Sequence, residues 1–143
     1  LYGILKNIDT LYKTLQQTSR LLLAFERLEA LRWQAWLRPG GTAIVNDRRI
    51  LPVAVALGEI AYPPDDALAE EFARAGQQLI LVDAQSIARE LGNVRVVNAV
   101  VLGVLSRYLD ADLPPALWEA NIARRVPVRA VAVNLAAFQQ GRA

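Results

Sequence analysis

Residues 89–109, RELGNVRVVNAVVLGVLSRYL, decide the centre of the fold. A helix is predicted to end at Gly92-Asn93, because both residue types are typical of positions just past a helix C-terminus. From Val94 to Leu109 the sequence is almost wholly apolar. The polar exceptions are Arg95, Asn98, Ser106 and Arg107. A helix that is apolar on nearly every side belongs inside a domain. This one is too short and too interrupted to span a bilayer, which takes about 20 apolar residues.

Two residues of this helix carry specific predictions. Asn98 is its one amide, so we expect Asn98 to be buried and hydrogen-bonded to a loop around Gly92-Asn93 or to a strand end, since an unpaired buried amide costs about 1–3 kcal/mol. Gly103 lies five residues further on, where the missing side chain would let another backbone approach closely. A ligand-binding role and a purely structural role both stay open for Asn98.

The composition limits the chemistry that the chain can perform. With 143 residues it has the length of one domain, and its hydrophobic content of 54% and mean hydropathy of +0.22 leave apolar surface for a partner. It contains no cysteine and no histidine, which excludes disulfides, the usual zinc sites and Ser-His-Asp catalysis. Residues 1–20 lack the pattern of a signal peptide, so we expect a cytoplasmic protein that does not enter a membrane.

Residues 1–20 differ in composition from the rest of the chain. They hold both lysines and, as three bases against one acid, the entire net charge of +2, whereas residues 21–143 hold 13 arginines and 13 acids. Their apolar residues follow a three-four spacing that predicts an amphipathic helix. The apolar positions are Leu1, Ile4, Ile8, Leu11 and Leu15. We interpret residues 1–20 as a foreign or replaced segment that covers an apolar surface, with an ordinary surface helix as the alternative. The neutral remainder disfavours nucleic-acid binding.

Residues 21–91 alternate short apolar runs with helical patterns. Strands are predicted at 21–25, 42–46 and 79–82, and helices at 28–37, 66–75 and 85–91. Residues 38–41, RPGG, are interpreted as the end of the first helix and a turn. Strand, helix and strand with short connections favour parallel pairing. The predicted fold class is therefore α/β, a three-layer structure with a mostly parallel sheet followed by a C-terminal helical section.

A polar residue follows the carboxyl end of each predicted strand, where open α/β sheets place their ligands. These residues are Glu26, Asn46 and Asp83. We predict that the three line one crevice, and we keep helix capping as the alternative role for Asp83. The remaining candidates for ligand or interface contacts are Gly92, Asn93 and Asn98. No catalytic residue and no metal ligand is assigned.

Five segments, taken together and in order, resemble a known family. They are LLLAFERLEALR (21–32), LRPGGTAIVN (37–46), LVDAQSIARELGNVRVVNAVVLGVL (81–105), LPPALWEANIARRVP (113–127) and VNLAAFQQG (133–141). From Leu21 to Gly141 the chain resembles the gamma-type domain of 2-oxoacid:ferredoxin oxidoreductases, in the indolepyruvate branch, where this subunit is often called beta. The most specific parts are ELGN with Asn98 and Gly103, and the closing NLAAFQQG.

The resemblance implies a component of a thiamine-diphosphate enzyme that oxidatively decarboxylates a 2-oxoacid, makes an acyl-CoA and passes electrons through iron–sulfur clusters to ferredoxin. Those cofactors are bound mainly by other domains of the family, so none is expected on this chain alone, although in some members the gamma-type domain helps bind coenzyme A. The implied partner is the catalytic alpha-type subunit or domain, with ferredoxin as an indirect partner, in a homo- or hetero-oligomer. The Gly-rich GxGGQG-type element of the family has no counterpart before Leu21.

Two hypotheses about function follow. The first is a subunit or domain that packs on the catalytic core of such an oxidoreductase and is inactive by itself. The second is a stand-alone, non-catalytic α/β module, truncated or engineered, that binds a small molecule or a protein. Copurification with a large subunit that carries thiamine diphosphate and clusters would distinguish them.

Overall fold

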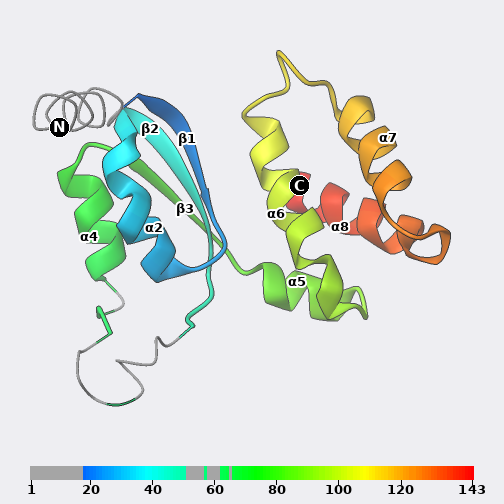
Figure 1. The fold of residues 1–143 in the computed structure, drawn as a ribbon, viewed down its shortest axis with the longest axis horizontal. Helices are drawn as coiled ribbons and strands as arrows, with labels where there is room; N and C mark the ends of the chain where they lie inside the picture. The colour runs from blue at the N-terminus through cyan, green and yellow to red at the C-terminus, as the bar shows by residue number, and fades with distance from the viewer. Residues whose placement is uncertain (1–17, 51–56, 58–61, 65) are drawn as a thin grey trace, which may run out of the picture. The chain divides into compact units, whose positions relative to one another are not determined.

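The computed structural model describes residues 18–50, 57, 62–64 and 66–143 (Figure 1). Its contacts divide the chain into two compact units, Leu1–Leu81 and Val82–Ala143, which we call the sheet unit and the helical unit. Residues 1–17 of the predicted N-terminal helix lie outside the described residues. The end of that helix was placed wrongly, because Ser19 and Arg20 belong to the first strand.

Among the described residues, the sheet has three strands in the order β1-β2-β3. They are β1 (Ser19–Ala24), β2 (Leu37–Asn46) and β3 (Gln78–Val82). β1 and β2 are parallel, with Ala24 opposite Val45, and β3 runs the same way (Figure 1), so the prediction of parallel strands is confirmed. Only the central strand has a continuous buried run, over residues 41–46. β1 and β3 are the outer strands of the part of the sheet that the structure describes, and most of their apolar residues are half-buried rather than buried as predicted.

The beginning of β2 differs from the prediction. Residues 38–41 are part of the extended strand and form neither a helix end nor a turn. Between the pairs Ser19–Leu37 and Leu21–Thr42, β1 advances by two residues and β2 by five, so β2 carries a bulge of three extra residues. Gly40 has φ +73°, a conformation that favours glycine, and its N–H donates to the carbonyl of Gly76 at 2.8 Å. The glycine pair thus marks a bulge.

Helices α2 (Arg27–Trp33) and α4 (Ala67–Arg74) lie on one face of the sheet (Figure 1). A short 3-10 segment, Gln34–Trp36, connects α2 to β2. The buried cluster between the helices and the sheet consists of Ala24, Ala30, Leu37, Ala43, Val45, Leu68 and Phe72. The predicted helix over 66–75 is confirmed, with Asp66 as its N-cap residue.

The helical unit follows β3. It contains α5 (Ala84–Glu90), α6 (Val97–Arg107), α7 (Pro115–Arg125) and α8 (Val131–Arg142), with 3-10 segments at Val94–Val96 and Val128–Ala130. α6 packs on α5 and α8, and α8 also contacts α7. The α/β class, with a parallel sheet followed by a C-terminal helical section, is confirmed. No helix in the described part of the chain combines the length and the apolar character needed to cross a membrane.

α6 and α8 cross backbone to backbone at two glycines. A Cβ atom added to Gly103 would overlap the carbonyl oxygen of Phe138 and lie 3.0 Å from the Cα of Gly141. A Cβ added to Gly141 would in turn overlap the carbonyl oxygen of Val100. The predicted backbone approach at Gly103 is confirmed, and the approaching backbone is that of α8.

An arginine fork joins the ends of these two helices. Arg142 donates from Nη1 and Nη2 to the two carboxylate oxygens of Asp110, both at 2.9 Å, and Nη1 also donates to Ser106 Oγ at 2.6 Å. The hydrogen bonds from Arg142 lower the pKa of the Asp110 carboxyl. A bidentate pair of this kind fixes both charge and orientation.

Candidate functional site

Glu26 is the centre of the polar contacts at the end of β1. The residue is only 5% exposed and is the N-cap of α2, where Oε2 accepts hydrogen bonds from Leu28 N at 2.8 Å and Glu29 N at 3.1 Å. Oε1 accepts from Tyr62 OH at 2.6 Å and from Ile50 N at 3.3 Å. Both carboxylate oxygens are therefore occupied by donors from α2 and from the segment after β2.

Two arginines make further contacts around Glu26, at the end of β1. Arg27 donates from Nε to Asp47 Oδ1 at 2.6 Å and from its backbone N to the carbonyl of Arg48 at 3.1 Å. The guanidinium of Arg49 lies 5.7 Å from the ring centre of Tyr62, within the range of a cation–π contact. These contacts join the segment after β2 to the start of α2.

Tyr62 should ionise unusually late. Burial and the hydrogen bond to the Glu26 carboxylate raise the pKa of Tyr62 to about 12. Since the folded state holds this proton more strongly than the unfolded chain, Tyr62 contributes stability that is complete below pH about 10 and is lost as the pH rises through about 12. Absorbance at 295 nm after rapid mixing should show a tyrosine step near pH 12 that disappears in Tyr62→Phe and persists in Tyr108→Phe. A Tyr62→Phe titration identical to wild type would contradict the assignment.

Asn46 lies beside Glu26, as expected for neighbouring parallel strands. Its side chain is 1% exposed, and Nδ2 donates to the carbonyl of Phe25 at 3.3 Å. Its Oδ1 is buried without a partner among the described residues. The structure thus brings two of the three predicted strand-end residues together, and it uses the carboxylate of Glu26 for capping.

Asp83 takes the capping role that was kept as its alternative. It is exposed and caps α5, with Oδ1 accepting from Ser86 N at 3.0 Å and Oδ2 accepting from Ser86 Oγ at 2.6 Å. Those two hydrogen bonds hold the pKa of Asp83 below its ordinary value. Asp83 belongs to the helical unit, whereas Glu26 and Asn46 belong to the sheet unit.

Gly92 and Asn93 form the turn predicted at the end of α5. Gly92 N donates to the carbonyl of Arg89 at 2.9 Å and Asn93 N donates to that of Ala88 at 3.0 Å, the two bonds of a Schellman motif. The Asn93 side chain then caps the next segment, because its Oδ1 accepts from Arg95 N at 3.0 Å. The side chain of Asn93 thus sets the position from which α6 starts.

The prediction that Asn98 is buried was wrong. Asn98 is exposed, and its side chain makes no hydrogen bond with the part of the chain that the structure describes. The buried face of α6 is formed by Ala99, Val100, Val101, Gly103 and Ser106. Because α8 and α5 cover only this face, Asn98 lies on the uncovered side of the helix.

Asn98 instead lines a groove of about 420 Å³ within the helical unit, which we call the α6–α7 groove. Two helical stripes form its walls. From α6 and the segment before it come Arg95, Asn98, Ala99 and Leu102; from α7 and its end come Trp118, Asn121, Ile122, Arg125 and Val126. Asn134 of α8 completes the lining. A second cavity of about 430 Å³ shares Arg95, Val126 and Asn134 and adds Asn93, so two of the candidate residues lie in one region.

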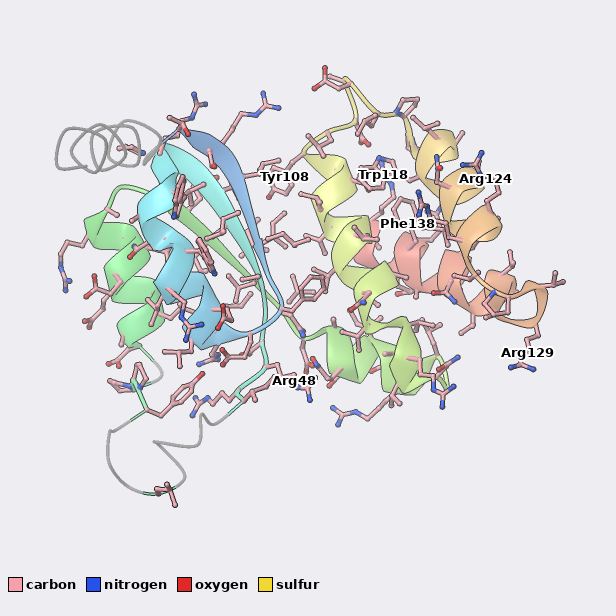
Figure 2. The ribbon with its side chains drawn as sticks, in the orientation of Figure 1. Arg48, Tyr108, Trp118, Arg124, Arg129 and Phe138 are labelled. Carbon is pink, nitrogen blue, oxygen red and sulfur yellow. The ribbon has the colours of Figure 1, made fainter. Side chains whose placement is uncertain are left out.

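The groove combines an aromatic floor with polar rims. The Trp118 ring stacks on Phe138 at 6.4 Å between ring centres, and its Nε1 donates to the carbonyl of Leu113 at 3.1 Å. Figure 2 shows Trp118 and Phe138 within the helical unit, while Arg124 and Arg129 point outward. Asn121 and Asn134 each donate from Nδ2 to the carbonyl four residues earlier, at 2.8 Å in both cases. Hence these amides are held in place by their own helices.

The sequence reading did not find the α7 half of this groove. Its signal was nevertheless present: Arg95, Asn98, Ala99 and Leu102 follow the spacing of one helix face, as do Trp118, Asn121, Ile122 and Arg125. Two helix faces that mix amides and arginines with apolar residues indicate surfaces that are partly exposed to solvent. Within the described residues no group of three or more Asp or Glu side chains could hold a metal ion.

A parallel sheet whose strands alternate with helices, followed by further packed helices, defines the α/β class of proteins. Residues 6–143 match the family model described as pyruvate ferredoxin/flavodoxin oxidoreductase, and the chain belongs to this family. The resemblance seen in the sequence is thereby confirmed.

Similar proteins include archaeal subunits named indolepyruvate oxidoreductase subunit IorB. The one from Thermococcus kodakarensis is 34% identical over 125 residues, the one from Pyrococcus horikoshii 35% over 125, and the one from Archaeoglobus fulgidus 31% over 121. Each alignment covers 85% of this chain and 60% of the relative. The chain therefore spans about 60% of the length of these relatives.

A crystal structure supports the fold. The gamma subunit of a keto/oxoacid ferredoxin oxidoreductase from Geobacter sulfurreducens superposes with a TM-score of 0.60 and 24% sequence identity. The match covers 85% of this chain and 61% of that chain. Like the sequence relatives, this protein is longer than the chain that we describe.

Proposed function

We propose that the chain is part of a non-catalytic subunit of a 2-oxoacid:ferredoxin oxidoreductase, and that it packs on the catalytic core of the complex. The observation that carries this proposal is the family match over residues 6–143. The names of the three archaeal relatives favour indolepyruvate as the 2-oxoacid. In this proposal the chain provides a packing surface that orients the catalytic core, while the partner carries the catalytic groups.

The composition agrees with this division of labour. The 143 residues contain no cysteine and no histidine, so these residues supply neither cysteine ligands for a cluster nor the common general base. We therefore assign thiamine diphosphate, the iron–sulfur clusters and coenzyme A to the complex, the catalytic alpha-type subunit as the direct partner, and ferredoxin as an indirect one. Assembly in the cytoplasm, as a homo- or hetero-oligomer, completes the proposal.

Reconstitution tests the proposal. The full chain and the thiamine-dependent catalytic subunit from the same genome should be purified separately, mixed, and assayed for indolepyruvate-dependent reduction of ferredoxin with coenzyme A present. We expect coelution in size-exclusion chromatography. We also expect a rate at least about tenfold above that of the catalytic subunit alone, because small changes in the positioning of reacting groups alter a rate by about tenfold or more. Pyruvate in place of indolepyruvate serves as the control for substrate class.

Separate elution of the two proteins, with a catalytic rate that the added chain does not change, would contradict the proposed subunit role. Coelution with reduction of pyruvate but not of indolepyruvate would keep the subunit role and overturn the substrate assignment.

A further inference from the structure

The α6–α7 groove lies in the part of the helical unit that is rich in positive charge. The two sequence segments that supply most of its walls, residues 92–109 and 120–143, contain six arginines and no Asp or Glu. The acids that lie between these segments in sequence are partly engaged, since Asp110 binds Arg142 and Glu119 accepts a hydrogen bond from Gln139. The potential in the groove therefore favours an anion.

Two of these arginines line the groove itself. Arg95 and Arg125 both border it, both are exposed, and neither makes an ion pair with any residue in the described ranges. Asn98 adds an amide whose donors and acceptor are likewise unused within the described residues. Three side chains with free donors thus converge on one cavity whose remaining walls are mostly apolar, the usual composition of a small-molecule site.

The kind of donor indicates the kind of anion. Phosphate sites in proteins commonly rest on free backbone N–H groups at a helix N-terminus. Here Trp118 and Arg125 lie beyond the first three residues of α7, where backbone N–H groups are used by the helix itself, and the N–H of Arg95 is taken by Asn93. Asn98 is the second residue of α6 and contributes its side-chain amide to the groove. The side-chain donors of Arg95, Asn98 and Arg125 are planar guanidinium and amide groups, which match the planar fork of a carboxylate.

We propose that the α6–α7 groove binds an amphipathic carboxylic acid. Its carboxylate lies against Arg95, Arg125 and Asn98, and its aromatic or branched apolar body lies on Leu102, Trp118 and Ile122. The cavity volume of about 420 Å³ is within the usual range for small-molecule sites. This site is independent of the proposed subunit role, because it requires only the helical unit.

Titration of the full chain with 3-phenylpropanoate tests the site. Isothermal calorimetry should show saturable binding of one molecule per chain, and the NMR signal of the Trp118 indole N–H, assigned with Trp118→Phe, should shift with the same Kd. Arg95→Gln and Arg125→Gln should each raise Kd about tenfold or more, since each removes a charge-assisted hydrogen bond. Arg107→Gln removes the same charge from the exposed end of α6, outside the groove, and should leave Kd within about twofold.

Analogues of the probe separate charge from apolar contact. The uncharged 3-phenylpropanamide lacks the carboxylate, and acetate lacks the aromatic group. Both should bind at least about tenfold more weakly than 3-phenylpropanoate. Tighter binding of phenyl phosphate than of 3-phenylpropanoate would overturn the assignment to a carboxylate. An absence of saturable binding, or an equal effect of Arg107→Gln and Arg125→Gln, would overturn the site.

Discussion

Replacing Gly103 with alanine should lower the free energy of unfolding by more than about 3 kcal/mol or prevent folding of the helical unit. The added methyl group would overlap the Phe138 carbonyl oxygen and would touch the backbone of Gly141. Both neighbours are backbone atoms of α8, so relief requires the two helices to move apart. The substitution would otherwise favour the helix by nearly 1 kcal/mol, which makes a large loss diagnostic of the crossing.

Gly76→Ala is the matched control for this experiment. Gly76 has φ +64°, and a Cβ atom added there meets nothing within 4 Å. Only the backbone conformation is penalised, at a cost of about 1–2 kcal/mol. Chemical unfolding followed by circular dichroism measures both variants. If Gly103→Ala were as stable as Gly76→Ala or more stable, the close crossing of α6 and α8 would be refuted.

The features that sequence predicted well are those set by local chemistry. The apolar runs gave the three strands, and the spacing of strand and helix gave their parallel direction. The Gly92-Asn93 pair gave the end of α5, because a Schellman turn needs residues of this type. Gly103 correctly predicted the close approach of another backbone, because a glycine within an apolar helix leaves room for one. Each of these predictions was made from residues close together in the chain, although the partner at Gly103, helix α8, is distant in sequence.

What sequence did not predict depends on which faces are covered. The apolar character of residues 94–109 suggested burial on every side, yet α6 has neighbours on one side and a groove on the other, so Asn98 is exposed. Likewise, the glycines at 40 and 41 correctly indicated an unusual backbone conformation, but they did not show whether it belongs to a helix end or to a strand bulge. Both structures use a positive φ, which Gly40 has here. Tertiary packing decides such cases.

Glu26 combines both situations. Its position after an apolar run marked it as a candidate, and its role as the N-cap of α2 is local. Its contacts with Ile50 and Tyr62 are 24 and 36 residues away in sequence, and no spacing rule reveals them. The structure therefore changes the interpretation of Glu26 from a strand-end ligand to a residue that connects three segments.

Glu26→Ala should consequently destabilise the sheet unit by about 3 kcal/mol. The loss of the N-cap accounts for about 1 kcal/mol, and the rest comes from stranding the Tyr62 hydroxyl and the Ile50 N–H beside a mostly buried position. Glu26→Gln retains an acceptor oxygen and should cost less. Chemical unfolding measures both variants.

Glu70→Ala is the control for the charge change, because Glu70 is exposed in the first turn of α4, and it should change stability by less than about 0.5 kcal/mol. In a double-mutant cycle, Tyr62→Phe should cost much less in the Glu26→Ala background than in the wild type, since the shared hydrogen bond of 2.6 Å has already been lost. Additive losses would mean that Glu26 and Tyr62 stabilise the fold independently, and the three-segment connection through the Glu26 carboxylate would have to be abandoned.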